Sequence, residues 1–242
     1  MTLSNALFRA RLGFPWCTAI FVAGSVLTSL PMFFSSHYYL ILGAGNEQAD
    51  NPRIHWWHTV VTTFVHGGGF PGLTAHLAIN CAFFLVLGSL LERTLGTARY
   101  GALCGACLVV SFALKVALSR YAHGISNVAW SFVALAPVLI GHAWRKHRGR
   151  ALRDPVFVAV VVLFVLGLIG LVNTWHAVAM LVGMPFVFAW RAVLRDNLHR
   201  VDTGQPLDRW GRWATGVAIA VPALLAGSSV SMSIAAVLGY LH

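Results

Sequence analysis

The chain has 242 residues, of which 58% are hydrophobic and only 10% charged, and its formal net charge is +10. Soluble domains carry about 25% charged residues, so this composition excludes an ordinary soluble protein. The positive charge does not indicate a nucleic-acid-binding protein, because the basic residues cluster in short segments between apolar runs. The composition therefore predicts a membrane protein with no nucleic-acid partner.

Apolar runs near twenty residues long recur along the chain, and each is long enough to cross about 30 Å of hydrocarbon. We predict seven spans, the first broken near Pro31: Trp16–Leu42, Thr74–Leu91, Tyr100–Leu118, Ser126–Trp144, Pro155–Val172, Trp175–Trp190 and Ala214–Leu238. The first run follows Arg9 and Arg11, as in a signal peptide, but its length and the lack of a small-residue cleavage site favour a retained helix. The fold class is an all-α, polytopic membrane helix bundle that forms a single transmembrane domain over residues 1–242.

The charges between the spans predict the orientation. Fourteen Lys and Arg residues fall on the side of the N-terminus, whereas only Arg53 and Arg120 fall on the other. Positive residues accumulate on the cytoplasmic side, so we expect a cytoplasmic N-terminus, an external C-terminus and a place in the plasma membrane. Lys115 lies inside the third predicted span, near its outer end, and we expect its side chain to snorkel to the surface.

The segment between the first two spans is long, aromatic and weakly charged. It contains His55, Trp56, Trp57, His58 and His66, followed by a glycine-rich stretch. Two interpretations stay open: a segment that lies in the outer interface with Trp at headgroup level, or an ordinary interfacial loop. The histidines have no Cys or carboxylate at ligand spacing, so we predict no metal site.

The four cysteines all lie in apolar runs. Cys104-Gly-Ala-Cys107 has the spacing of a metal or redox motif, but it lies in the middle of a span with no His or Asp beside it. We therefore interpret this pair as part of a packed helix face.

Three polar clusters begin the second, fourth and sixth spans, which all run inward. They are His76 with Asn80, Gly124-Ile125-Ser126-Asn127, and Asn173-Thr174-Trp175-His176. His76 and Asn80 share a helix face, and the orientation places all three clusters at one depth. Ser with His is the minimum for a base-activated nucleophile, and a second His with an Asn suits an oxyanion site. The usual orienting carboxylate is missing, so local packing must hold the imidazole.

These residues resemble the motifs of the rhomboid family of intramembrane serine proteases, from about Trp56 to Gly183. The matching elements are Trp57-His58-Thr59 with Phe64-Val65-His66; His76-Leu77 with Asn80; Gly88, Glu92, Arg93 and Gly96; Gly124-Ile125-Ser126; and His176 with Gly183. No single element is specific, but their order on the predicted helices is.

The resemblance implies a fold and a set of roles. The fold is a six-helix core, residues 16–194, with one additional C-terminal helix, residues 213–240. Ser126 is then the nucleophile and His176 the general base, while His76, Asn80 and the Ser126 backbone N–H stabilise the oxyanion. Substrates are single-pass membrane proteins cut near the outer face, and the reaction needs no cofactor and no metal.

The sequence also departs from the family pattern. Asn127 follows the serine where the family has Gly, which permits close backbone approach. Ser131 and Ala179 replace glycines, but both are small enough for close packing beside Gly183. His58 replaces an Arg, and Glu92 and Arg93 are adjacent where the family spaces them by one residue.

Three functions are consistent with these motifs and with the departures from them. The leading one is an intramembrane serine protease. The alternative is a non-catalytic rhomboid-like protein that binds transmembrane helices without cutting them, which Asn127 favours. A small transporter or channel fits less well, because no matched pair of Gly/Pro-broken helices is present.

Overall fold

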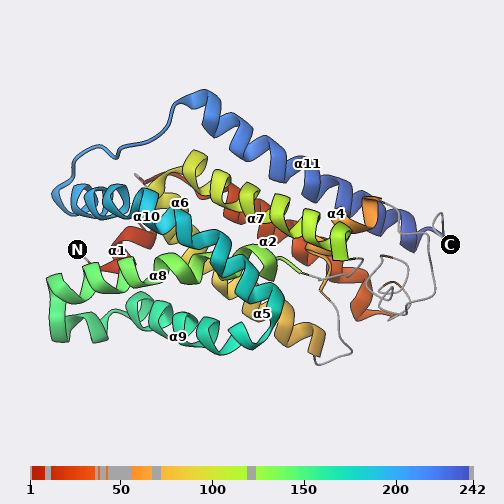
Figure 1. Ribbon diagram of the computed structural model, residues 1–242, viewed down its shortest axis with the longest axis horizontal. Helices are drawn as coiled ribbons and strands as arrows, with labels where there is room; N and C mark the ends of the chain where they lie inside the picture. The colour runs from red at the N-terminus through yellow and green to blue at the C-terminus, as the bar shows by residue number, and fades with distance from the viewer. Residues whose placement is uncertain are drawn as a thin grey trace.

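The computed structural model describes residues 2–8, 12–35, 38, 42, 56–66, 72–118 and 124–239, and these residues form a bundle of helices (Figure 1). The α-helices are α1 Leu3–Phe8, α2 Trp16–Ser29, α4 Trp56–Phe64, α5 Gly72–Phe83, α6 Ser89–Leu95, α7 Thr97–Leu118, α8 Ser126–His147, α9 Pro155–Ile169, α10 Thr174–Thr203 and α11 Arg212–Val237. Within these ranges there is no β-strand, so the predicted all-α class is confirmed.

Seven helical segments in the described residues are long and apolar enough to cross a membrane. They are Trp16–Phe33, Gly72–Leu95, Thr97–Lys115, Ser126–Arg153, Pro155–Val172, Thr174–Thr203 and Arg212–Val237. Each predicted span has one counterpart, and Pro155–Val172 agrees at both ends. The chain is therefore a multi-pass integral membrane protein.

Two spans differ from their predicted form near residues that disturb helical geometry. The first changes to a 3₁₀ turn, Leu30–Phe33, which begins one residue before Pro31, and this membrane-capable segment ends at Phe33, well before the predicted Leu42. The second contains a π-helical stretch, Phe84–Gly88, between α5 and α6. Hydropathy carries no signal for a π-helix, so this feature was not predicted.

The sixth span was predicted to end at Trp190, but α10 continues to Thr203. Charged residues end the hydropathy signal, yet Leu194, Leu198 and Val201 repeat at helical spacing and are buried. The helix ends only at Gly204, whose φ of 82° forms a left-handed C-terminal cap.

The segment before the second span is partly helical, which the sequence did not predict. Its residues Trp56–Phe64 form α4, which packs against α2 and α11. The predictions for Arg53, His55, the stretch 67–71 and Arg120 fall outside the described residues.

The core of the bundle is the contact between α8 and α10, which lie side by side along much of their length. At Gly183 of α10, an added Cβ would lie 2.6 Å from the Ser131 carbonyl oxygen and 3.2 Å from the Ala134 Cβ of α8. Lipid gives apolar helices no hydrophobic reason to associate, so a small residue that permits close approach is what brings such helices together. We call the end where both helices begin the site end, and the opposite end, which carries Arg145–Arg153, the basic end.

Glu92 of α6 fixes the start of α2 in the bundle interior. Its carboxylate accepts the backbone N–H groups of Cys17 at 3.0 Å and Thr18 at 2.9 Å, and the Thr97 hydroxyl at 3.0 Å. The first N–H groups of a helix have no partner within the helix, so a buried carboxylate at that position satisfies them.

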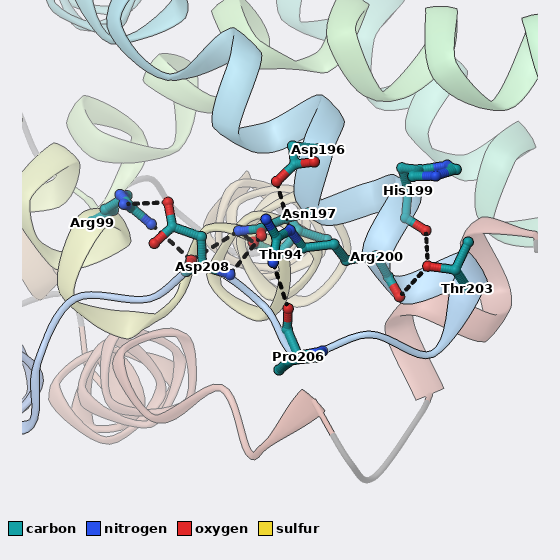
Figure 2. Close-up of polar contacts among 9 residues, drawn as sticks. All are labelled: Thr94, Arg99, Asp196, Asn197, His199, Arg200, Thr203, Pro206 and Asp208. Carbon is teal, nitrogen blue, oxygen red and sulfur yellow. Dashed lines mark hydrogen bonds and ion pairs between the residues drawn. The ribbon is translucent and has the colours of Figure 1, made fainter.

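The seventh span, α11, lies along one edge of the bundle beside α2 and α7 (Figure 1). The linker between α10 and α11 is held in place at the basic end by the polar contacts drawn in Figure 2. Asn197 Nδ2 donates to the carbonyl oxygens of Thr94 and Asp208, and Asn197 Oδ1 accepts the Asp208 N–H at 2.8 Å. Arg99 adds an ion pair to Asp208 at 3.0 Å. One asparagine therefore connects α6, α10 and the linker.

The α8–α10 contact predicts opposite effects for two glycine substitutions. Gly183→Ala places a methyl group against the Ser131 carbonyl, so the free energy of unfolding should fall by about 1–3 kcal/mol. Gly227→Ala on α11 meets no atom within 4 Å, so the better helix former should raise it by up to about 1 kcal/mol. Thermal unfolding in detergent measures both. Equal shifts of the same sign would contradict the proposed contact.

Candidate active site

Ser126 is the first residue of α8, and the turn that leads to it is held from several sides. The Gly124 N–H donates to the Thr62 carbonyl of α4 at 2.8 Å. Gly124 has a φ of +83°, and an added Cβ there would lie 2.9 Å from His66 Nε2 and 3.5 Å from Asn80 Nδ2. The turn therefore needs glycine both for its backbone conformation and for space. The Asn80 side chain therefore lies close to Gly124, which precedes the predicted nucleophile Ser126 by two residues in the sequence.

His66 follows α4 and is buried beside the second predicted histidine, His76. Their ring centroids lie 5.1 Å apart in an edge-on arrangement. The His66 backbone N–H donates to Ser29 Oγ at 3.1 Å, and its Nδ1 lies 3.1 Å from the Phe64 carbonyl oxygen. The motif resemblance pointed to His66 as part of a loop element, but not to its place against Gly124 and His76.

His176 lies in the first turn of α10 and its imidazole is fixed by two contacts. The ring stacks on Trp130 of α8, with centroids 3.7 Å apart and planes 16° from parallel. Its Nδ1 lies 3.0 Å from the Gly170 carbonyl oxygen. Because a carbonyl oxygen only accepts, we assign the proton to Nδ1, which leaves Nε2 of the neutral ring as the basic nitrogen.

Trp130 is itself anchored, which makes it a rigid platform for the imidazole. Its Nε1 donates to the Gly167 carbonyl oxygen at 3.0 Å, and its other face stacks on Phe83 at a centroid distance of 4.7 Å. An added Cβ on Gly170 would lie 2.6 Å from the indole ring. The packing that the sequence analysis required in place of a carboxylate is therefore an indole ring and a backbone carbonyl.

The register of α8 against α10 places Ser126 and His176 at one level. Gly183 contacts Ser131 and Ala134, and His176 precedes Gly183 by two helical turns. Two turns before Ser131 and Ala134, the chain is at residues 124–127. Ser126 also lies one helical turn before Trp130 on α8. The two side chains therefore share a helix face, and His176 stacks on the Trp130 ring. The side chain of Ser126 is buried, and His176 is half-buried.

His76 lies at the same end, since its ring contacts that of His66, which packs against Gly124. The structure thus gathers Ser126, His176, His76 and Asn80 from α5, α8 and α10 at the site end. Of the other predicted residues, Gly124 forms the turn, Gly183 lies in the α8–α10 contact, and Ala179 is buried on α10 one turn before Gly183.

Two buried amides stand out at this site. They belong to Asn80 and Asn127. In each side chain, neither Oδ1 nor Nδ2 forms a hydrogen bond with the described part of the chain. A buried polar group without a partner is unfavourable and commonly marks a place where water or a ligand binds. Both amides are therefore preorganised groups whose hydrogen-bonding capacity is available.

Lys115 corrects one prediction about the surroundings of the site. Its side chain does not snorkel: the residue is 3% exposed, and its Nζ lies 3.4 Å from the Thr62 hydroxyl of α4. The chain of contacts continues from Thr62, whose carbonyl holds Gly124. Hydropathy placed Lys115 near a helix end but could not show that α4 covers it.

No cluster of three metal-ligating side chains occurs among the residues that the structure describes. Cys104 and Cys107 are buried, and both are free thiols within the described range. They lie on α7, whose interior face packs in the bundle core.

The fold defines a class, that of polytopic helical membrane proteins, and the predicted serine and histidine lie at the same end of its bundle. A family comparison then identifies the relationship: the model of the rhomboid domain matches residues 53–195. The chain belongs to the rhomboid family. Neither the curated proteins nor the solved structures contain a significant match.

The unpartnered amide of Asn80 predicts an unusual effect on stability. Asn80→Leu preserves the approximate shape of the side chain and removes two buried polar atoms, so the free energy of unfolding should rise by about 1 kcal/mol. Asn197→Leu is the matched control, because Asn197 is equally buried but fully bonded, and it should lose about 1–3 kcal/mol. Unfolding in detergent compares them, and a similar loss in both would show that Asn80 has a structural partner.

Proposed function

We propose that this protein is an intramembrane serine protease in which Ser126 is the nucleophile and His176 the general base. The observation that carries the proposal is the fixed imidazole of His176. Its Nδ1 bond to the Gly170 carbonyl and its stack on Trp130 leave Nε2 as the free basic nitrogen at the level of Ser126. A base in this state accepts the hydroxyl proton as the serine attacks.

In the proposed reaction, Ser126 Oγ bonds to the carbonyl carbon of the scissile peptide, and its proton passes to His176 Nε2. The carbonyl oxygen becomes an anion, which we assign to His76, the Asn80 amide and the Ser126 N–H. The C–N bond then breaks, His176 returns the proton to the leaving amine, and water hydrolyses the resulting ester with the same base. Loss of one oxyanion donor of this kind costs about 10²–10³ in rate.

The substrate class that we propose is single-pass transmembrane proteins. Membership of the rhomboid family and a site formed inside a helix bundle both support it. We also propose that the basic end faces the cytoplasm, together with the N-terminus, in the plasma membrane. Residues 16–194 would then form the catalytic core, cut substrates near the outer face, and be extended by the helix at 213–240.

A serine-directed fluorophosphonate or isocoumarin probe tests the chemistry directly. We expect labelling of the purified protein that is lost in Ser126→Ala and in His176→Ala. Ser131→Ala is the matched control for the serine, because the Ser131 hydroxyl is buried on the same helix but donates to the Val128 carbonyl at 2.7 Å. His142→Ala, at the basic end, is the control for the histidine. Labelling that survives in Ser126→Ala would refute the assignment.

The second candidate function is a non-catalytic rhomboid-like protein that binds transmembrane helices. Asn127 favours it, because a buried side chain stands beside the serine where the family has glycine. A labelled transmembrane peptide distinguishes the two functions: a protease cleaves it only with Ser126 intact, whereas a binding protein retains it equally with and without Ser126.

Asn127→Gly separates a slow enzyme from an inactive one. Removing the buried amide clears space beside Ser126, so we expect probe labelling several-fold faster than in the wild type. Labelling rates at equal protein concentration measure the effect, and the double variant Asn127→Gly/Ser126→Ala is the control. If only Asn127→Gly reacts and the wild type is silent, the non-catalytic function is the correct one.

A further inference from the structure

The segment that joins α8 to α9 concentrates positive charge at the basic end. It begins in the last turn of α8 and continues as the 3₁₀ turn Arg148–Arg153. A hollow of about 560 Å³ is lined by this segment alone: Arg145, Lys146, His147, Arg148, Gly149, Arg150 and Arg153. The arginines thus surround a space instead of projecting singly from the surface.

The nearby carboxylates do not neutralise Arg148, Arg150 and Arg153, although one of them pairs with Lys146, which also lines the hollow. Asp202 of α10 is paired with Lys146 and lies 3.5 Å from His142. Asp154 is buried, where it accepts the backbone N–H groups of Val156 at 3.1 Å and Ser4 at 3.2 Å and the Ser4 hydroxyl. Within the described ranges, no carboxylate pairs with Arg148, Arg150 or Arg153, and all three residues are exposed.

The segment is also firmly placed. Asp154 caps α9 and binds α1, and Ala151, in the middle of the arginines, is 2% exposed. Arg148 has a φ of 40°, which an L-residue adopts only when its surroundings impose it. The guanidinium groups therefore extend from a fixed backbone, which lowers the entropy lost when they bind a ligand together.

Exposed apolar residues flank the arginines and indicate the depth of the segment. Trp144 is 46% exposed and Leu152 is 61% exposed. Tryptophan at the end of a membrane helix lies at headgroup level, with its ring toward the acyl chains. Neither residue lines the hollow, but they are sequence neighbours of Arg145 and Arg153, which do. A ligand held by the guanidinium groups therefore has exposed apolar side chains next to it, which suits an amphipathic molecule better than a soluble anion.

We propose that this hollow binds the phosphate headgroup of an anionic phospholipid, with Arg148, Arg150 and Arg153 as its principal ligands. Guanidinium groups bind phosphate oxygens in a two-pronged geometry, and basic pockets beside membrane helices suit such headgroups. The site is remote from Ser126, at the opposite end of the bundle, so the proposal does not depend on the proposed protease activity.

The competing explanation is that these residues act only as a topology signal, for which any positive charge at this end serves equally. A matched pair of variants distinguishes the two. One replaces Arg148, Arg150 and Arg153 by Gln. The other replaces Arg191, Arg195 and Arg212, which are exposed at the same end on α10 and α11 but line no part of this hollow. Both variants lose the same charge.

The experiment uses the full chain in phosphatidylcholine nanodiscs that contain a minor fraction of fluorescent phosphatidylglycerol. The difference in energy transfer between each protein and its Trp144→Phe counterpart separates Trp144 from the other eight tryptophans and reports enrichment of the fluorescent lipid beside the hollow. Circular dichroism checks that each variant is folded. We expect enrichment in the wild type and in the Arg191/Arg195/Arg212 variant, and a loss of roughly tenfold or more in affinity when Arg148, Arg150 and Arg153 are replaced.

Other results would overturn the proposal. Equal losses in the two variants would show diffuse attraction to the membrane surface, and no enrichment in the wild type would leave only a topology signal. Soluble glycerol phosphate forms a further arm. If it displaces the lipid at a concentration comparable to that of the lipid, the hollow is a site for soluble phosphate and not for a phospholipid.

Discussion

The close approach of α8 and α10 at Gly183 is the constraint on which the candidate site depends. Two parallel helices that meet at a glycine cannot slide or separate without losing the contact with the Ser131 carbonyl. This register brings the first turns of both helices to one level, and with them Ser126 and His176. In lipid, where apolar surface alone does not drive helices together, packing of this kind fixes geometry as well as supplying stability.

Around this contact the protein handles buried polarity in two ways. Glu92 and Asn197 are buried, but each meets several partners, and each joins elements that are distant in the sequence. Asn80 and Asn127 are also buried, yet the described residues offer their amides no hydrogen bond. Glu92 and Asn197 lie toward the basic end and stabilise the bundle, whereas Asn80 and Asn127 lie close to Ser126. Such a division is expected where a site gives up stability for the capacity to bind.

Hydropathy predicted where the chain crosses the membrane because each crossing must bury its backbone polar groups in a helix. Pro155–Val172 agreed at both ends, since Asp154 caps this helix and Pro155 starts it. The same reasoning failed where structure depends on neighbours. The helix Thr174–Thr203 extends beyond the apolar stretch that predicted it, because its later residues pack on other helices. The helix α4 was missed because its nine residues are too few to cross a membrane, so the hydropathy pattern gave no span there.

The residues of the candidate site divide in the same way, into those that the sequence predicted and those that it did not. The motifs brought together Ser126, His176, His76 and Asn80, because three helices that run in one direction place their first residues at one depth. The groups that orient them left no such pattern. The Gly170 carbonyl is a backbone atom with no sequence signature, and Trp130 is one of nine tryptophans. Lys115 was predicted to reach the membrane surface but is buried, because α4, which is distant from it in the sequence, covers its side chain.

The π-helical stretch Phe84–Gly88 has a consequence for how such a site can evolve. A π turn accommodates one residue more than the α-helix around it, so it rotates everything that precedes it by about 100° relative to everything that follows. In this chain it separates Asn80 from Glu92, one at the site and the other anchoring α2. The two ends of one membrane helix are therefore free to be oriented independently, and a single inserted residue is enough to aim a side chain at a cavity without disturbing the anchor.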